Sequence, residues 1–334
     1  MSKNLRVITY IIPESFRGKT VEAFLRSEGF SKNVIYHLRN TGTDVLPADI
    51  SGLLLNNRKT WLRQTLKEGD ILCCSILETE DSPNVTETEI PLSIIYEDQD
   101  LMVINKPWNM PIHPSLGHHE NTLANALSWY THHKLGFDTY VNRVINRLDK
   151  NTSGLLISAK NMLSAAKLGD MVREHSIHRE YLAICQGDAR ELLPIYPSVA
   201  EGFDITIDAP IARKEESLVE RIVDFDRGDA AVTHVKVLSY NCDKDISLLR
   251  IKLETGRTHQ IRVHMRHAGH PLIGDFLYNP DFRFIERQAL HSHRLSFRHP
   301  VSGESLCFTA PLPEDMSRLF PDFIHINMLT APYR

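Results

Sequence analysis

A polar loop followed by an apolar segment constrains the fold of this chain more than any other feature. Residues 146–153 read NRLDKNTS and residues 154–159 read GLLISA. An apolar run of this length after turn-forming residues predicts a strand that is buried in a sheet. The strand would fix the backbone beside Asp149, and a rigidly held carboxylate suits catalysis. The same residues also suit an ordinary turn, because their side chains supply turn hydrogen bonds.

The length and composition predict a globular protein of two domains. The chain has 334 residues, of which 42% are hydrophobic, so it can bury a sizeable core. No apolar run approaches the roughly 18 residues of a membrane span, and the N-terminus lacks a signal-peptide pattern. We therefore expect a soluble, cytoplasmic protein with no membrane partner. No CxxC pair is present, so we expect reduced thiols at the five cysteines, Cys73, Cys74, Cys185, Cys242 and Cys307.

Charge is unevenly distributed along the chain. The formal net charge of −4 argues against a protein that coats nucleic acid indiscriminately. Residues 68–105 nevertheless contain ten acidic side chains and no Lys or Arg, whereas residues 250–270 contain five basic side chains and one acidic one. Local fields matter more than the sum when the partner is a polyanion. A solvated face explains each charge run equally well.

A polar stretch within the acidic region marks a domain boundary. TEDSPNVTETE at residues 79–89 contains Pro and has no hydrophobic period, which is typical of a linker. We therefore predict domains at residues 13–78 and 91–325, joined by a linker at residues 79–90.

The hydrophobic pattern of the first domain predicts two short amphipathic helices, with Gly29 between them and Ser31 as the N-cap of the second. Short strands follow in residues 53–72, separated by Asn-Asn and Glu-Gly-Asp turns. This order resembles an S4-type RNA-binding domain, in which the helix pair carries basic side chains to RNA phosphates. The resemblance assigns RNA contacts to Lys32 and Arg39. The match departs from the family at Asn57, where glycine is usual, and in a longer segment at residues 42–52.

The second domain is strand-rich with interspersed helices. Strands are predicted in DLMVINK before Pro107, in HREYLAICQG and in ISLLRIKLE, where Leu249, Ile251 and Leu253 alternate with charged residues. Helices are predicted in NTLANALSWY with a Thr cap, in SAAKLGDMVRE, and in THQIRVHMRHA with Thr258 as the N-cap and Gly269 as the stop. The last of these helices carries Arg262 and Arg266 one turn apart.

Four segments in order resemble the RluA-type pseudouridine synthases over roughly residues 91–315. They are RLDKNTSGLL, HREYLAICQG, LETGRTHQIRVHMRHAGHPLIGD and LHSHRLSFRHPVSGE. The resemblance implies an α+β fold: a catalytic domain with a largely antiparallel, bent mixed sheet, preceded by a small S4-like α/β RNA-binding domain. It implies an enzyme that isomerises specific uridines in structured ribosomal or transfer RNA. It also implies no cofactor and no metal, and we expect a monomer.

The resemblance also assigns roles to individual residues. Asp149 matches the catalytic aspartate, and Arg262 matches the arginine that pairs with it, for which a planar fork suits a bidentate contact. Tyr181 matches the tyrosine that lies against the target base and assists proton loss from C5. Arg147 matches the arginine that holds the flipped-out arrangement, and flipping the uridine costs a few kcal/mol. Asn146 stands where many members have histidine, so we expect differences in loop anchoring or RNA contact only.

Plainer explanations exist for each of these residues. Tyr181 could be an ordinary aromatic residue of a strand, and Arg262 could be a side chain that covers the surface of a helix. Arg257 and Thr258 either turn the chain or form a phosphate site at a helix N-terminus, and we assign Arg266 to phosphate as well. Two other classes of protein compete with the synthase. One is a non-catalytic RNA-binding protein of the same fold. The other is a metal-dependent hydrolase, which would use the clustered histidines His259, His264, His267 and His270, although no carboxylate there supplies an obvious further ligand.

Overall fold

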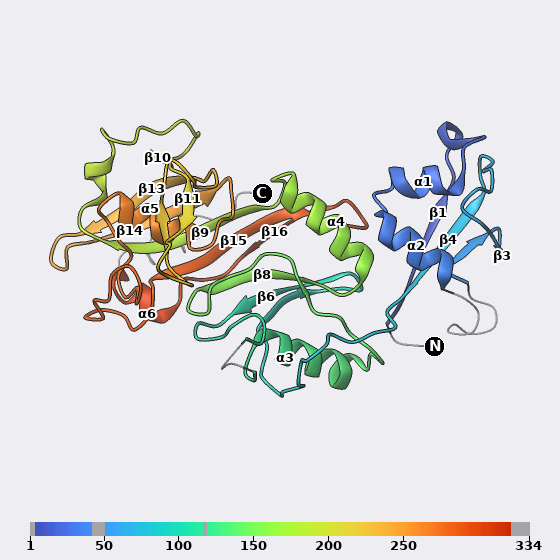
Figure 1. Ribbon diagram of the computed structural model, residues 1–334, viewed down its shortest axis with the longest axis horizontal. Coiled ribbons are helices and arrows are strands. Elements are labelled where there is room, and N and C mark those ends of the chain that lie inside the picture. The colour runs from blue at the N-terminus through green and yellow to red at the C-terminus, as the bar shows by residue number, and fades with distance from the viewer. Residues whose placement is uncertain (1–3, 42–50, 116–118, 322–334) are drawn as a thin grey trace.

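The computed structural model describes residues 4–41, 51–115 and 119–321. Most of the long segment at residues 42–52, and the end of the proposed second domain, lie outside these ranges. Figure 1 shows an elongated molecule, with a small N-terminal unit at one end and a larger unit built on a long sheet. No helix of the described residues is long and apolar enough to cross a membrane.

The small unit packs helices on an antiparallel sheet of order β1-β4-β2-β3. Its strands are β1 (Leu5–Ile11), β2 (Leu53–Leu55), β3 (Arg58–Lys59) and β4 (Ile71–Leu77), and its helices are η1 (Glu14–Phe16), α1 (Val21–Ser27) and α2 (Lys32–Asn40). The Ser31 hydroxyl accepts from the Val34 N–H, which confirms the N-cap expected for α2. Asn57 adopts φ 62°, a left-handed conformation that asparagine tolerates better than most residues. That conformation explains how asparagine replaces the expected glycine.

The large unit contains a ten-stranded sheet. Its main path runs β10-β13-β14-β9-β15-β8-β6-β5, while β16 pairs with β15 and β7 pairs with β8. All its pairings are antiparallel except that of β15 with β8, so the mixed, largely antiparallel sheet expected from the resemblance is confirmed. The strands are β5 (Ile94–Glu97), β6 (Leu101–Lys106), β7 (Arg143–Val144), β8 (Ser153–Ala159), β9 (His178–Gln186), β10 (Ile205–Asp208), β13 (Val232–Asn241), β14 (Ile246–Leu253), β15 (Leu290–Arg298) and β16 (Ser305–Thr309).

Helices and a small hairpin complete the large unit. The hairpin consists of β11 (Ile211–Arg213) and β12 (Arg221–Val223). The helices are α3 (Leu123–Trp129), η2 (Tyr130–Leu135), α4 (Met162–Arg173), η3 (Ala189–Leu192), α5 (Gln260–His267) and α6 (Glu314–Ser317). Thr122 caps α3 as expected.

Strand β8 lies at the centre of the core. All seven of its residues are buried, which confirms the expected buried strand. Leu156 packs with Leu123 and Leu127 of α3 on one face of the sheet, and Leu155 packs with Leu168 of α4 on the other. Each face therefore has an apolar core of its own, and the chain just before β8 is firmly anchored.

Gly154 allows β8 to approach β15 closely. Its φ is +112°, and a Cβ at this position would lie 2.3 Å from the backbone oxygen of Ser292. Any other residue would both strain the backbone and force the two parallel strands apart.

The helix that carries Arg262 begins later than the sequence predicts. Its N-cap is His259, with φ 60° and ψ 16°, rather than Thr258. The Gln260 side chain accounts for the difference, because its Oε1 accepts the Arg257 N–H at 2.9 Å and so holds the preceding turn. Helix α4 also begins slightly before the predicted segment SAAKLGDMVRE, at Met162, because Asn161 caps it.

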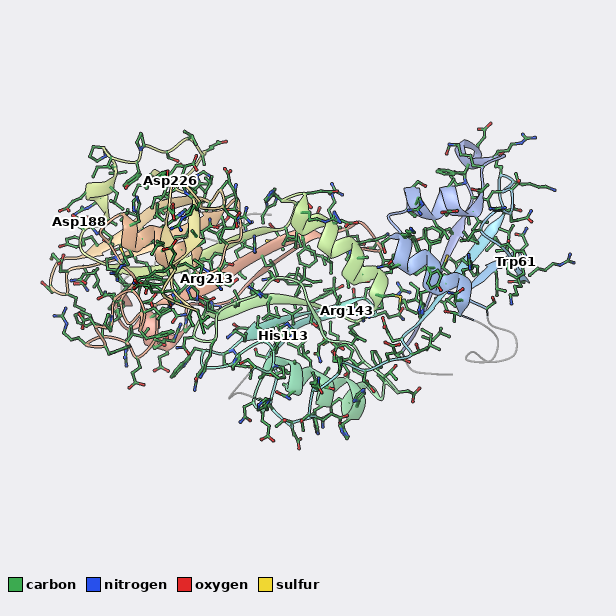
Figure 2. All side chains as sticks on the ribbon, in the orientation of Figure 1. Trp61, His113, Arg143, Asp188, Arg213 and Asp226 are labelled. Atoms are coloured by element: carbon green, nitrogen blue, oxygen red, sulfur yellow. The ribbon has the colours of Figure 1, made fainter. Side chains whose placement is uncertain are left out.

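Charged side chains join the two units. The Arg6 guanidinium donates to both oxygens of Asp100, at 2.9 Å and 2.7 Å, and the Asp100 side chain is only 3% exposed. Glu78 pairs with Arg143, which is labelled in Figure 2, at 2.8 Å. The segment expected to be a linker also lies against the large unit, since the Ser82 N–H donates to the Tyr140 carbonyl. We still propose a division at residues 79–90 between closely joined units, but the first unit begins before residue 13, because β1 (Leu5–Ile11) pairs with β4.

Replacing Arg6 by methionine tests how much this junction contributes to stability. Arg6→Met leaves the Asp100 carboxylate buried without its cation, so we expect the free energy of unfolding to fall by about 2 kcal/mol. Arg26→Met is the matched control, because its ion pair with Glu22 is exposed and should contribute less than about 0.5 kcal/mol. Denaturant unfolding of the full chain measures both, and equal effects would contradict this view of the junction.

Candidate active site

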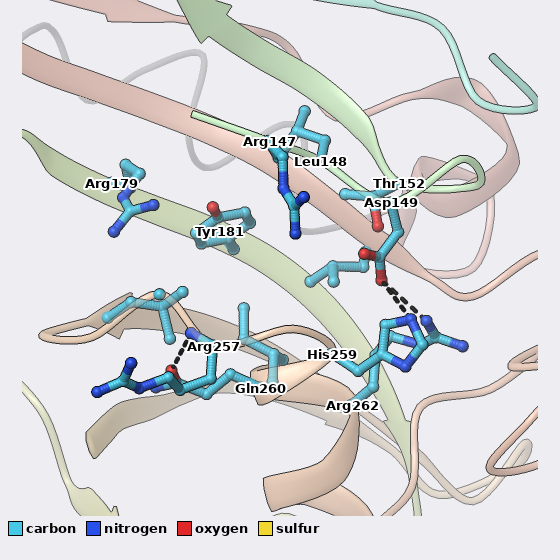
Figure 3. A pocket seen from close by; sticks show the side chains of 14 residues that line it. Arg147, Leu148, Asp149, Thr152, Arg179, Tyr181, Arg257, His259, Gln260 and Arg262 are labelled. Atoms are coloured by element: carbon cyan, nitrogen blue, oxygen red, sulfur yellow. Dashed lines mark hydrogen bonds and ion pairs between the residues drawn. The ribbon is translucent and has the colours of Figure 1, made fainter. Parts of the chain in front are cut away.

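A pocket lies between the polar loop before β8 and the start of α5 (Figure 3). Strand β9 forms its back wall and contributes Arg179 and Tyr181. The pocket brings together most of the residues singled out in the second domain, namely Arg147, Asp149, Tyr181, Arg257 and Arg262. Thr258 lines an adjoining groove that also contains Arg147 and Asp149.

The ion pair expected between Asp149 and Arg262 is present. Arg262 Nη1 donates to Asp149 Oδ2 at 2.8 Å. The Arg262 side chain is 1% exposed and that of Asp149 is 30% exposed, so the carboxylate lies between a buried cation and the open pocket. The backbone oxygen of Asp149 accepts the Thr152 N–H at 3.0 Å, which closes the turn into β8. The segment is thus both a turn and the site of a paired carboxylate.

The bidentate contact of Arg262 is with Asp275, and not with Asp149 as the sequence suggested. Nε and Nη2 of Arg262 donate to the two oxygens of Asp275 at 2.6 Å and 2.7 Å. Asp275 is fully buried and also accepts the Leu277 N–H at 3.0 Å. Asp275 belongs to the quoted GHPLIGD segment, but nothing in its spacing distinguishes it from a turn residue. Sequence reasoning therefore missed the group that fixes Arg262.

Arg262 stays charged in this environment. Burial lowers its pKa, but the hydrogen bonds to Asp275 and the negative charge of Asp149 outweigh burial, so the net shift is upward. One guanidinium thus faces two carboxylates, and it uses three of its N–H groups on them.

Tyr181 is buried beside Asp149. Burial is the main reason that its pKa is raised, although the Arg179 charge lowers it. Tyr181 therefore remains a neutral phenol at neutral pH, able to donate or accept a hydrogen bond. Arg179 lies two residues before it on the same strand face, and this period-2 spacing is the signal that could have revealed it.

Two further groups hold the loop that carries Asp149. Lys106, at the end of β6, is fully buried, and its Nζ donates to the carbonyl oxygens of Pro107, Met110 and Lys150. Burial lowers the pKa of Lys106 to about 7. Asn146 accepts the Ile157 N–H at 2.8 Å and donates to the Leu155 carbonyl. Its amide therefore forms hydrogen bonds with the β8 backbone much as a neighbouring strand would, and so anchors the loop.

Three of the basic residues assigned to RNA lie outside this pocket. Arg266 is exposed, and its Nη1 donates to the Tyr278 carbonyl at 2.6 Å. Lys32 and Arg39 are exposed on α2 of the small unit, where Arg39 lies over the Tyr36 ring.

The clustered histidines have separate partners. His264 is buried between Thr233 Oγ1 and the Ala209 carbonyl, and burial lowers its pKa to about 4. His270 contacts the Gln186 carbonyl, and His259 contacts the Tyr278 hydroxyl. Within the described ranges, the metal-type ligands that converge are Asp98, Asp100 and His299, which lie away from this cluster and already have protein donors.

Comparisons with known proteins agree with the geometry. The family model for RNA pseudouridylate synthase matches residues 100–267. The chain is 37% identical over 300 residues to an uncharacterized RNA pseudouridine synthase, YjbO, of Bacillus subtilis, covering 90% of this chain and 98% of that protein. It is 41% identical over 244 residues to the ribosomal large subunit pseudouridine synthase D of Zymomonas mobilis, covering 70% of this chain and 73% of that protein.

Among solved structures, human RNA pseudouridylate synthase domain containing 1 has a similar fold. The TM-score is 0.53 at 23% identity, over 77% of this chain and all of that one. Fold, family model and relatives that match along most of their length all agree. The chain therefore belongs to the RNA pseudouridine synthases of the RluA/RluD type, enzymes that isomerise uridine in RNA.

Proposed function

We propose that this synthase modifies uridines of large-subunit ribosomal RNA, using Asp149 as its catalytic carboxylate on a base flipped into the pocket. The observation that carries the proposal is the ion pair of Asp149 with the buried Arg262 at the pocket wall. The choice of RNA rests on the relatives named for the large ribosomal subunit. Transfer RNA is the second candidate, as expected from the resemblance. We further propose that the enzyme acts as a monomer in the cytoplasm.

The main chemical group that the reaction requires from the protein is a carboxylate at the sugar. The bond from C1′ to N1 breaks, the base turns, C1′ bonds to C5, and the proton on C5 leaves while N1 gains one. The product is an isomer of the substrate, so the balance requires no oxidant and no co-substrate. Asp149, when ionised, acts as nucleophile or base at the sugar. Arg262 Nη1, at 2.8 Å from Oδ2, supplies the counter-charge to that carboxylate.

The geometry favours Asp149 Oδ1 as the reacting oxygen. Arg262 occupies Oδ2 at 2.8 Å, and His259 also faces Oδ2. Figure 3 shows the second oxygen turned toward the side of the pocket that carries Arg147 and Tyr181. A uridine whose base lies against Tyr181 would place its sugar near that oxygen. The neutral Tyr181 phenol would then serve the base as a hydrogen-bonding group and not as a phenolate.

Basic side chains around the pocket supply contacts for the RNA backbone. Arg147, Arg179 and Arg257 line it, and Thr258 lies in the adjoining groove. Their charges would attract phosphate and offset the few kcal/mol needed to flip a base. We assign further phosphate contacts to Arg266 and, on the small unit, to Lys32 and Arg39. These contacts position the RNA, and none of them takes part in the chemistry.

Mapping pseudouridine at base resolution, in cells with and without this protein, tests the substrate. We expect one or more sites in large-subunit ribosomal RNA to lose the modification. Loss confined to transfer RNA would reject the ribosomal assignment while leaving the enzyme class intact.

Replacing Asp149 by asparagine tests the catalytic carboxylate. Asp149→Asn keeps the side-chain shape and removes its charge, so we expect turnover to be abolished while RNA binding weakens less than about tenfold. Tritium release from an RNA transcript labelled at C5 of uridine measures turnover, and a filter-binding titration measures affinity. Substantial residual turnover would reject the assignment.

Replacing Arg262 tests how the carboxylate is held. Arg262→Met removes both the charge and the Nη1 donor that contacts Asp149 Oδ2. We expect kcat to fall about 100-fold at saturating RNA, because the carboxylate loses its counter-charge and its fixed orientation. Arg262→Lys should be intermediate, because a point charge replaces the planar fork.

Arg266→Met is the matched control on the same helix. We expect it to weaken RNA binding and to reduce the salt dependence of binding, with an unchanged kcat at saturating RNA. If the two methionine variants behaved alike at saturating RNA, the proposed role of the ion pair would be wrong.

A further inference from the structure

His259 is a strained residue beside the proposed catalytic carboxylate. Its backbone is left-handed, with φ 60° and ψ 16°, which costs a non-glycine residue about 1 kcal/mol. Its side chain is only 10% exposed. The ring Nε2 lies 3.8 Å from Asp149 Oδ2, and Nδ1 lies 3.0 Å from the Tyr278 hydroxyl. In this conformation the ring lies in the site, between Asp149 and Tyr278.

The partners of Tyr278 determine which ring nitrogen of His259 carries the proton. The Tyr278 oxygen accepts the backbone N–H of Arg221 at 2.9 Å, and a backbone N–H can only donate. The hydroxyl proton of Tyr278 therefore needs another acceptor, and His259 Nδ1 is the acceptor that the structure provides. In a neutral ring this leaves Nδ1 without a proton and places the proton on Nε2. The Nε2–H group then faces Asp149.

Burial, together with two nearby arginines, keeps the His259 ring neutral. Burial is the largest influence on the pKa of His259 and lowers it, and Arg262 of α5 and Arg221 of β12 lower it further. Asp149 of the loop before β8 and Asp275 of the segment after α5 raise it, but the net shift is downward. At neutral pH, above this lowered pKa, His259 is therefore the neutral donor described above.

We propose that His259 is a positioning residue, whose Nε2–H completes the set of donors on Asp149 Oδ2 and thereby leaves Oδ1 for the sugar. The inference rests on the proposed function of Asp149. At 3.8 Å the contact is longer than a hydrogen bond, but such bonds are often long before substrate binds and shorten in the complex. Arg262 and His259 then hold the same carboxylate oxygen from two directions. Tyr278 contributes indirectly, because its hydroxyl determines which ring nitrogen of His259 carries the proton.

Two substitutions of His259 separate the donor from the rest of the side chain. His259→Asn suits the left-handed backbone and keeps an acceptor near the position of Nδ1, but it has no group that reaches Asp149. His259→Gln places an N–H donor near the position of Nε2. Tyr278→Phe keeps the aromatic ring of residue 278 but removes the hydroxyl that selects the tautomer of His259. His267→Asn is the matched control, since His267 is an exposed residue of the same helix.

The measurement is the single-turnover rate of tritium release, across a series of RNA concentrations up to saturation, with the C5-tritiated large-subunit transcript. For His259→Asn we expect a maximal rate about tenfold lower, since the carboxylate loses a donor that orients it. His259→Gln should stay within about threefold of the wild type, and Tyr278→Phe should lose about threefold. The RNA concentration that gives half of the maximal rate should change less than about twofold in each, and His267→Asn should match the wild type.

The outcomes distinguish this inference from the function on which it rests. An unchanged maximal rate in His259→Asn would overturn the positioning role. So would a raised half-saturating RNA concentration with an unchanged maximal rate, or a defect in His259→Gln equal to that in His259→Asn. Asp149→Asn is measured in parallel. If it is inactive while His259→Asn behaves as the wild type, the inference about His259 alone is wrong. If Asp149→Asn turns over, the proposed catalytic carboxylate is wrong.

Discussion

The buried guanidinium of Arg262 is the group on which the geometry of the site depends. It is 1% exposed and joins Asp275, fully buried, to Asp149, which faces the pocket. A cation this deeply buried is costly unless it is fully paired, and the fork on Asp275 supplies that pairing. Asp275 thus fixes Arg262 through two hydrogen bonds, and one of the remaining N–H groups of Arg262 holds Asp149. The proposed catalytic carboxylate is therefore held firmly although it is 30% exposed.

The sheet is the second structural element that fixes the position of Asp149. Strand β8 is buried on both faces, and Gly154 lets it pair closely with β15. Asn146 and Lys106 tie the loop before β8 to its surroundings through hydrogen bonds to β8 and to backbone carbonyls. Arg262 approaches from a helix more than a hundred residues later in the chain. Asp149 is thus held on one side by the sheet and on the other by α5, and the pocket lies between them.

The sequence predicts the local parts of this arrangement and misses the parts that depend on tertiary contacts. The apolar run of β8, the Ser31 and Thr122 caps and the alternation in β14 all follow from local pattern, and the structure confirms them. The pairing of Asp149 with Arg262 came from the resemblance to a family, because no periodicity connects residues so far apart. Asp275 was missed because it contacts Arg262 only in the folded chain, and no local sequence pattern indicates that contact. The N-cap was assigned to Thr258 because propensity favours threonine, whereas the Gln260 side chain and the left-handed His259 determine the true start of the helix.

A crystal structure of the complex with RNA is the most direct test of the central claim, that Arg262 holds Asp149 Oδ2 and leaves Oδ1 to react. An RNA fragment whose target uridine carries fluorine at C5 suits this purpose, because fluorine replaces the proton that must leave from C5. We expect the sugar C1′ of that nucleotide to lie against Asp149 Oδ1, with Arg262 still bonded to Oδ2 and to both oxygens of Asp275. A structure in which Arg262 has left Asp149 for an RNA phosphate, or in which the sugar lies against Oδ2, would contradict the claim.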